Sequence, residues 1–223
     1  MFDWLKKKNY PEYWESYSAR FSHRKDIELE KIRFVVFDTE TTGLQLTKDR
    51  ILSIGAVSVL GNSIDVSDSL ETYVEQEEFN KDSVAIHGLL KQGNFIKLSE
   101  KEAIIQFLDF IKDAVLVAHH TAFDLGMINE CLKRQGLPRL KNKTLDTGIL
   151  FKKTKQHEPK EKPYSLDELC NLFHIPKHDR HTASGDAFIT ALLFLKMISQ
   201  LKKRNLKLTL NDLLFIKPRH GLI

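Results

Sequence analysis

The stretch Phe34-Val35-Val36-Phe37-Asp38-Thr39-Glu40 decides the fold of this 223-residue chain. Four consecutive apolar residues predict a strand that is buried on both faces, as in the centre of a sheet covered by helices. Asp38 follows these residues directly, and Glu40, two residues later, faces the same side. Because open α/β sheets bind ligands at the carboxyl ends of their strands, the two carboxylates predict a functional site there.

The elements after this strand predict a mixed α/β fold, with a five-stranded sheet flanked by helices. The Gly61-Asn62 turn signal joins two of the further strands, and Ser99 and Ser165 each begin a capping box that opens a helix. Further strands are expected at 50–60, 63–74, 114–118 and 144–147. Helices are expected at 9–31, 99–111, 122–135, 147–153, 165–173 and 182–203.

Composition excludes several classes of protein. With 42% hydrophobic and 29% charged residues, the chain is neither disordered nor collagen-like. No apolar run approaches the roughly 20 residues that a bilayer requires, so no membrane partner is expected. The only cysteines, Cys131 and Cys170, fall on apolar positions of predicted helices and are expected to be reduced core thiols in a cytoplasmic protein.

Charge is unevenly distributed along the chain. Residues 133–163 hold ten Lys or Arg against three acids, and residues 196–223 hold seven against one, whereas the centre of the chain is acidic. This pattern suits a metal site with a rim that binds a polyanion, and it equally suits a solvated surface. The lysines that are candidates for following a nucleic-acid backbone are Lys141, Lys143, Lys152, Lys153 and Lys155.

Two further acids stand in apolar surroundings. Asp124 opens the helix that follows strand 114–118, and Asp186 is the only charged residue between Thr182 and Leu195. An ionised carboxylate buried without a partner costs several kcal/mol. No Lys or Arg lies at a helical or strand spacing that would neutralise these acids, so bound Mg²⁺ or Mn²⁺ is expected. Taken singly, each acid is also compatible with an ordinary strand end or helix first turn.

His181 lies five residues before Asp186, at the entry to the final helix. An imidazole at this place, near the same acids, can accept a proton at neutral pH. A lone histidine is more often structural, so the spacing to Asp186 carries this interpretation.

Three segments of the sequence resemble the DEDDh exonuclease family, the group of the bacterial proofreading epsilon subunit. They are FDTETTGL at 37–44, LVAHHTAFD at 116–124 and HTASGDA at 181–187, with lesser similarity in VAIHGL at 84–89 and LDT at 145–147. The resemblance covers about residues 33–200. We therefore expect an exonuclease domain at 33–203, with a helical N-terminal extension at 1–32 and a tail at 204–223 that both lie outside the resemblance. One departure is His120, where the family usually has Asn.

The resemblance implies an RNase H-like sheet and two divalent metal ions, Mg²⁺ or Mn²⁺, bound by Asp38, Glu40, Asp124 and Asp186. It implies stepwise hydrolysis from a 3′ end with release of 5′-mononucleotides, and His181 as the general base. By the same resemblance, the substrate-binding residues are Thr41, Gly43, Leu44, His87 and Phe123.

The expected partner is the 3′ end of a single-stranded nucleic acid, with DNA preferred over RNA and a DNA polymerase as a further candidate. Three alternatives remain open at this point. The chain can be an RNA 3′-end exoribonuclease of the same fold, or a module that binds nucleic acid without cleaving it. It can also be a phosphatase or phosphotransferase that uses Asp38 as its nucleophile, although Ala187 and Phe188 after Asp186 do not supply the acid pair that such folds usually have.

Overall fold

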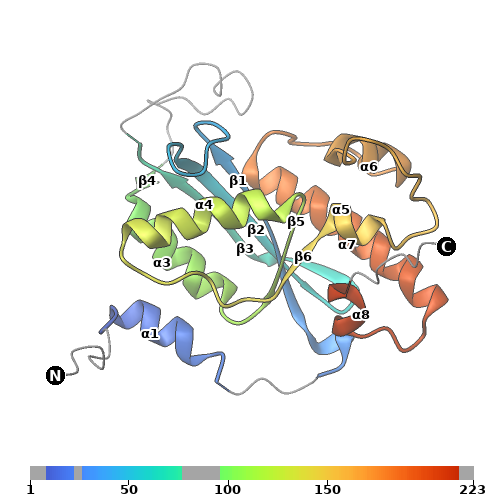
Figure 1. Ribbon diagram of the computed structural model, residues 1–223, viewed down its shortest axis with the longest axis horizontal. Helices are drawn as coiled ribbons and strands as arrows, with labels where there is room; N and C mark the ends of the chain where they lie inside the picture. The colour runs from blue at the N-terminus through green and yellow to red at the C-terminus, as the bar shows by residue number, and fades with distance from the viewer. Residues whose placement is uncertain (1–8, 23–26, 77–95, 216–223) are drawn as a thin grey trace, which may run out of the picture.

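The computed structural model describes residues 9–22, 27–76 and 96–215 (Figure 1). Within these residues, six strands form one mixed sheet in the order β4-β3-β2-β1-β5-β6. The strands are β1 (Arg33–Thr41), β2 (Ile51–Leu60), β3 (Ser63–Val74), β4 (Lys97–Leu98), β5 (Val115–Ala118) and β6 (Thr144–Asp146). The helices are α1 (Glu12–Ala19), the 3-10 helix η2 (Leu29–Lys31), α3 (Glu100–Ile111), α4 (Thr121–Arg134), α5 (Thr147–Phe151), α6 (Leu166–Leu172), α7 (Ala183–Arg204) and α8 (Leu210–Leu214).

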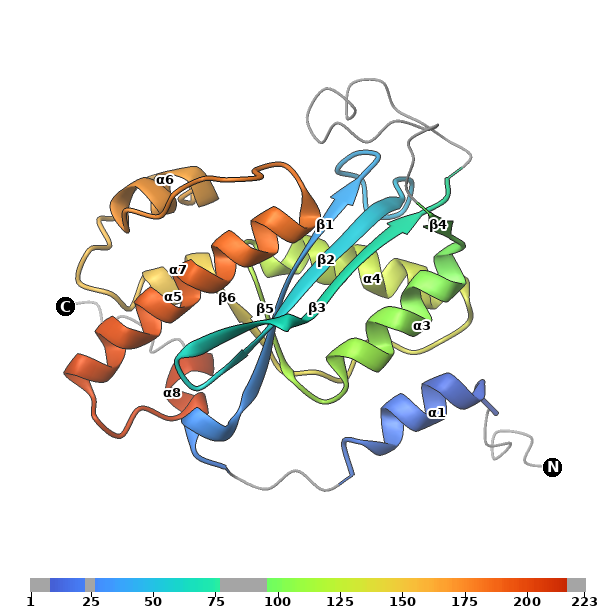
Figure 2. The same cartoon turned by 180° about the vertical axis from the view of Figure 1, so that it is seen from behind.

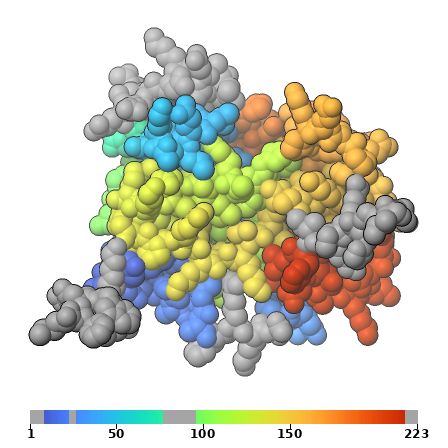
Figure 3. All heavy atoms as spheres, viewed as in Figure 1, coloured from blue at the N-terminus to red at the C-terminus, as the bar shows by residue number. Residues whose placement is uncertain are grey.

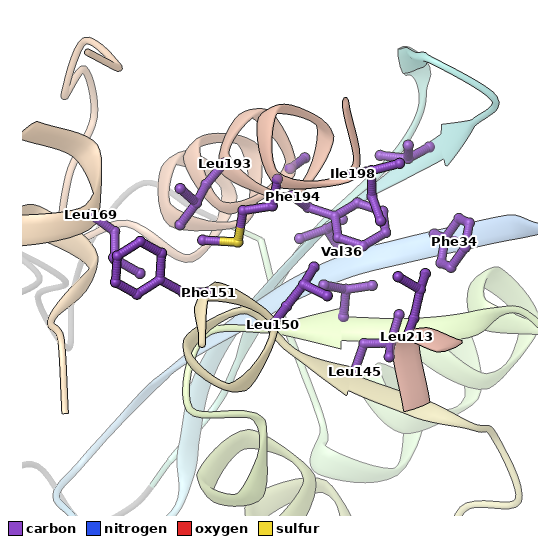
Figure 4. Close-up of a cluster of buried hydrophobic side chains, with 14 of the residues drawn as sticks. Phe34, Val36, Leu145, Leu150, Phe151, Leu169, Leu193, Phe194, Ile198 and Leu213 are labelled. Carbon is purple, nitrogen blue, oxygen red and sulfur yellow. The ribbon is translucent and has the colours of Figure 1, made fainter. Parts of the chain in front are cut away.

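β1 lies between an antiparallel and a parallel neighbour, and its side chains alternate between two hydrophobic cores. Phe34 and Val36 pack with residues of α5, α6 and α7 (Figure 4). Val35 and Phe37 pack on the opposite face with residues of α3 and α4. Figure 2 shows α7 running across one face of the sheet, whereas Figure 1 shows α4 in front of the other face. The expected two-sided burial of this strand is therefore confirmed.

The predicted α/β fold is confirmed, but the expected number of strands is wrong, because the sheet has six strands and not five. The additional strand is β4, which pairs with β3 through Lys97 opposite Tyr73 and Leu98 opposite Val74. A strand of two residues carries no alternation of apolar and polar residues, so the sequence pattern could not reveal it.

The N-terminal helix is shorter than expected, since α1 ends at Ala19 and not near residue 31. Its aromatic side chains serve packing: Trp14 and Tyr17 are buried in the core cluster that includes α3. The hydroxyl of Tyr17 donates to Asn142 Oδ1 (2.6 Å) and accepts from the N–H of Lys141 (2.8 Å). These contacts join α1 to the loop that precedes β6.

Helix α8 was not expected in the predicted tail, and it packs onto the domain. Leu213 is buried in the cluster of β1 and α7, and Figure 3 shows α8 in red on the surface beside the segment that follows α4. Lys153 Nζ donates to the backbone carbonyls of Asp212, Leu213 and Phe215 at 2.6–2.8 Å. Lys153 therefore supports the C-terminal end of α8, which accounts for one of the five candidate lysines structurally.

Helix α7 is long and apolar enough, by length and composition, to cross a membrane. Just over half of its most apolar 18-residue window is buried within this structure, and its side chains form much of the core on one face of the sheet. The apolar composition of α7 is thus explained by packing against β1 and β2.

Candidate metal centre and active site

Asp38 and Glu40 lie at the carboxyl end of β1 on the face that α7 covers, because they continue the alternation of Phe34 and Val36. Both side chains are half-buried. A register shift between Glu40 and Thr41 ends the regular pairing of β1 with β2 just after them. The central strand therefore carries two carboxylates to the point where its pairing becomes irregular.

Gly55 allows α7 to bring a third carboxylate to the same place. Gly55 lies opposite Asp38 in the β1–β2 pairing. A Cβ atom at Gly55 would lie 2.2 Å from the backbone of Ala183, the first residue of α7. Only glycine permits so close an approach of a helix end to a strand. Asp186, in the first turn of α7, consequently lies beside β1: carboxylate oxygens of Asp38, Glu40 and Asp186 all fall within 4.8 Å of one another.

Asp124 reaches the site from the opposite face of the sheet. It lies in the first turn of α4, and its Oδ1 accepts hydrogen bonds from the backbone N–H (3.0 Å) and the hydroxyl (2.7 Å) of Thr39. Thr39 points toward α4 because it alternates with Asp38 along β1. Asp124 is not within the 4.8 Å group, but its charge acts directly on Asp38.

The position of α4 is fixed by Asp146, at the end of β6. Asp146 Oδ2 accepts from the N–H of Thr121 (2.8 Å), the first residue of α4. Its Oδ1 accepts from the N–H groups of Gly148 and Ile149 at the start of α5. The carboxylate of Asp146 thus caps α5 and also binds the first residue of α4, which gives the LDT segment at 145–147 a structural role. His120, just before α4, has a left-handed φ of 59°, a conformation that Asn adopts readily.

The crowded carboxylates resist ionisation. Burial raises the pKa of Asp38 well above its usual value, and the charge of Asp124 adds to this effect. Burial and the charge of Asp186 raise the pKa of Glu40 to about 7. Burial also raises the pKa of Asp124 to about 7, although the hydrogen bonds from Thr39 oppose the shift. Nearby positive charge opposes these shifts, as the charge of Arg180 does for the pKa values of Asp38 and Glu40.

The donor set fits hard divalent cations. Each of Asp38, Glu40 and Asp186 offers a carboxylate oxygen, the ligand type that Mg²⁺ and Mn²⁺ prefer. Asp186 Oδ1 is buried, and its partner among the described residues is the guanidinium of Arg180, with which it forms an ion pair. Three carboxylates this close together, one of them buried, repel one another and are stabilised by a cation.

The expectation that no Lys or Arg neutralises these acids is wrong, because Arg180 forms an ion pair with Asp186. Arg180 lies six residues before Asp186, a separation that brings no pair together on a helix or strand. It reaches Asp186 through the loop before α7, where Asp179 and His181 both have positive φ. Spacing arguments assume regular helix or strand backbone, so they missed the contact that Arg180 makes from this loop.

His181 is exposed at the edge of the cluster, and its N–H donates to Asp186 Oδ2 (3.3 Å). The backbone of His181 is therefore fixed to one of the candidate metal ligands, while its imidazole is open to solvent. The role of His181 as proton acceptor stays a prediction.

The substrate-binding candidates lie around the same end of β1. Thr41 is buried, and its hydroxyl donates to the carbonyl of Gly43 (2.8 Å). Leu44 is 83% exposed, although it is apolar. Phe123, one residue before Asp124, is half-buried against the core of α3 and α4. His87 lies outside the described residues.

Comparisons with known proteins agree with this geometry. The family model "Exonuclease" matches residues 35–194. A DNA polymerase III PolC-type of Caldanaerobacter subterraneus subsp. tengcongensis is 36% identical over 78% of this chain, which spans 12% of that relative's length. A DNA polymerase III subunit epsilon-like protein of Rhodobacter capsulatus is 35% identical over 86% of this chain and 27% of its own length.

Solved structures share the fold. The crystal structure of E. coli exonuclease I in complex with a dT13 oligonucleotide aligns with a TM-score of 0.65 and 14% identity, over 78% of this chain and 42% of that chain. Cell-death related nuclease 4 aligns with a TM-score of 0.64 and 16% identity, over 76% of this chain and 64% of that chain. The sheet order, the acid cluster and the matched family model lead to one conclusion: the chain belongs to the DnaQ-like DEDD exonuclease family, with an RNase H-like fold.

Proposed function

We propose that this protein is a 3′–5′ exonuclease that removes nucleotides one at a time from single-stranded DNA, with two divalent metal ions held by Asp38, Glu40, Asp124 and Asp186. The observation that carries the proposal is the convergence of carboxylates from β1 and α7, with Asp124 of α4 beside them. Metal ions at such a site stabilise the negative charge that develops on a phosphodiester during hydrolysis and lower the pKa of the attacking water.

We assign further steps of the reaction to individual residues of the chain. Asp38 and Glu40 are placed by the sheet, so their oxygens are oriented before substrate arrives. The exposed imidazole of His181 takes the proton released by the attacking water and passes it to solvent. Exposed Leu44 can contact the terminal base without reading its identity, because apolar and stacking contacts tolerate every base.

The names of similar proteins support DNA as the substrate. PolC-type and epsilon-like DNA polymerase III proteins are among the relatives, and exonuclease I was crystallised with a dT13 oligonucleotide. A role in proofreading or in trimming DNA ends, with a DNA polymerase as partner, follows as part of the proposal. RNA remains the alternative substrate.

The test uses single-stranded DNA and RNA of one sequence, labelled at either end and incubated with Mg²⁺, Mn²⁺ or EDTA. The proposal predicts a descending ladder from 5′-labelled DNA, immediate release of a mononucleotide from 3′-labelled DNA, slower RNA cleavage and no reaction in EDTA. Release of the 5′ label first, or internal cuts, would contradict the proposed direction. Release of inorganic phosphate from a nucleoside monophosphate would instead support the phosphatase alternative.

A matched pair of variants connects the activity to the cluster. Asp186→Asn removes one charge from the site, whereas Asp109→Asn removes one exposed charge from α3, away from the cluster. Only the first variant is expected to lose nuclease activity. Binding of single strands by wild type without any cleavage would favour a non-catalytic module.

A further inference from the structure

Arg180 connects the acid cluster to helix α6. Its guanidinium binds the carboxylate of Asp167 in α6 with two hydrogen bonds, Nε to Oδ1 (3.0 Å) and a terminal nitrogen to Oδ2 (3.3 Å). A second terminal nitrogen forms the ion pair with Asp186 Oδ1. The side chain of Arg180 is only 16% exposed. Such fork-shaped contacts with two carboxylates hold an arginine in one orientation.

The conformation of the loop that carries Arg180 directs its side chain toward the acid cluster. The hydroxyl of Thr182 donates to the carbonyl of Asp179 (2.7 Å) and accepts from the N–H of Gly185 (3.1 Å). A Cβ atom at Gly185 would lie 2.0 Å from the Asp179 carbonyl oxygen. The loop therefore lies directly over the first turn of α7, and this contact requires glycine.

Arg180 brings a positive charge to the acid cluster. Among the ion pairs of the described residues, that of Arg180 is the one that reaches Asp38, Glu40, Asp124 or Asp186. The contact is with Oδ1 of Asp186, one of the three candidate metal ligands that lie close together. The guanidinium of Arg180 and a divalent cation would therefore bind the same carboxylate, that of Asp186.

We propose that Arg180 is a built-in counter-ion of the acid cluster, which pairs with Asp186 in the metal-free protein and competes with divalent metal for that carboxylate. Asp167 holds the guanidinium after the metal has displaced it from Asp186. Arg180 is thus a positioning residue that sets the metal affinity of the site. The inference rests on the proposed function, because it requires metal binding by Asp38, Glu40 and Asp186.

If Arg180 competes with metal, substitutions of Arg180 and of its partner Asp167 should change Mn²⁺ affinity in opposite directions. Arg180→Gln removes the competing charge, so Mn²⁺ is expected to bind about tenfold more tightly, because a cation no longer has to be displaced from Asp186. Asp167→Asn leaves Arg180 with Asp186 as its remaining carboxylate, so Mn²⁺ is expected to bind about threefold more weakly. Arg180→Lys keeps the positive charge but loses the planar guanidinium, so its Mn²⁺ affinity is expected to lie between those of wild type and Arg180→Gln.

Titration calorimetry with Mn²⁺ on the full chain measures these affinities without any substrate. The matched control is Arg134→Gln, which removes a similarly buried, two-bonded arginine from Glu100 and should leave Mn²⁺ affinity unchanged. As a second readout, the metal-free Tm of Arg180→Gln should fall below that of wild type, and saturating Mn²⁺ should raise it by more than in wild type.

The outcomes separate the two proposals. Weaker or unchanged Mn²⁺ binding by Arg180→Gln, or tighter binding by Asp167→Asn, would overturn the competition while leaving the metal site intact. If Arg180→Gln does not fold, Arg180→Lys and Asp167→Asn still give opposite predicted signs. Absence of Mn²⁺ binding by wild type would overturn the proposed function itself.

Discussion

The two sides of the acid cluster are held by different kinds of contact. On the α4 side, Asp124 receives two hydrogen bonds from Thr39, both from neutral groups whose positions follow from the sheet. On the α7 side, Asp186 is paired with the charged Arg180 of a loop. Neutral donors orient Asp124 but do not satisfy its charge, and its pKa still rises to about 7. Neutral donors therefore orient the α4 side, whereas on the α7 side we propose that a metal ion competes with Arg180 for Asp186.

The largest expected effect is the loss of nuclease activity when a carboxylate of the cluster is removed. Both Asp38→Asn and Asp186→Asn should lower nuclease activity by about 10³-fold or more, because several kcal/mol of charge stabilisation is lost. The two variants should differ in Tm without metal. Asp38→Asn relieves repulsion among the carboxylates, so its Tm should be higher than that of wild type. Asp186→Asn also loses the contact with Arg180, so its Tm should not rise. Activity assays and thermal unfolding in EDTA measure both. Wild-type turnover in either variant would contradict the metal-site account.

A second effect concerns His181 on the α7 side. Replacement by Asn keeps a residue type that tolerates the left-handed φ of 65° and removes the proton acceptor. Turnover of His181→Asn near pH 7 should fall by about 10²-fold, with little change in KM for single-stranded DNA. His178→Asn, in the same loop and also exposed, is the control and should match wild type. Equal turnover in both variants would remove the assigned role of His181.

The raised pKa values predict a pH dependence of stability. The pKa values of Glu40 and Asp124 rise from 4.5 and 3.8 in the unfolded chain to about 7 in the fold. Between about pH 4 and 7 the folded state therefore binds more protons than the unfolded state, and metal-free stability falls as pH rises through this window. Thermal unfolding in EDTA from pH 5 to 8 measures this effect. Saturating Mg²⁺ should remove most of the decline, and a metal-free Tm that increases over this range would contradict the shifts.

Metal affinity should change in the opposite sense. Because Mg²⁺ must displace protons from these carboxyl groups, its affinity should rise by about tenfold per pH unit below pH 7 for each proton displaced. Calorimetry in buffers of different ionisation enthalpy counts those protons. Binding without proton release at pH 6 would show that the carboxylates are already ionised.

The smallest effect tests the neutral donors on the α4 side. Thr39→Val removes the hydroxyl donor to Asp124 and keeps the backbone N–H, so Mn²⁺ affinity should fall by about tenfold, as expected for groups that orient metal ligands. Thr72→Val removes a comparable buried hydroxyl from Gln106, away from the cluster, and should leave affinity unchanged. Equal affinities in wild type and Thr39→Val would mean that the N–H alone orients Asp124.

The fold and the four acids were predictable because they leave local signals. A two-sided apolar run predicts β1, capping residues predict α3 and α6, and Asp186 stands out within an apolar helix. β4 escaped prediction because it exists only through its pairing with β3. α8 begins with a capping box of Thr209 and Asp212, a local signal that could have predicted it.

The residues of the site also differ in whether the sequence could predict them. Spacing arguments place Asp38 and Glu40 together because they share one strand. They fail for Arg180, which reaches Asp186 only because the loop turns back over Gly185. Helical and strand periodicities describe regular backbone, so they do not predict a contact made by Arg180, which lies between two loop residues with left-handed φ.

The central claim is that carboxylates of β1 and α7, with Asp124 of α4 beside them, form one divalent-metal site. The most direct measurement is anomalous scattering from crystals of the full chain soaked in Mn²⁺. The account predicts strong Mn²⁺ peaks contacted by Asp38, Glu40 and Asp186, and weakened peaks in Asp38→Asn. Carboxylates that remain without a peak at saturating Mn²⁺ would contradict it.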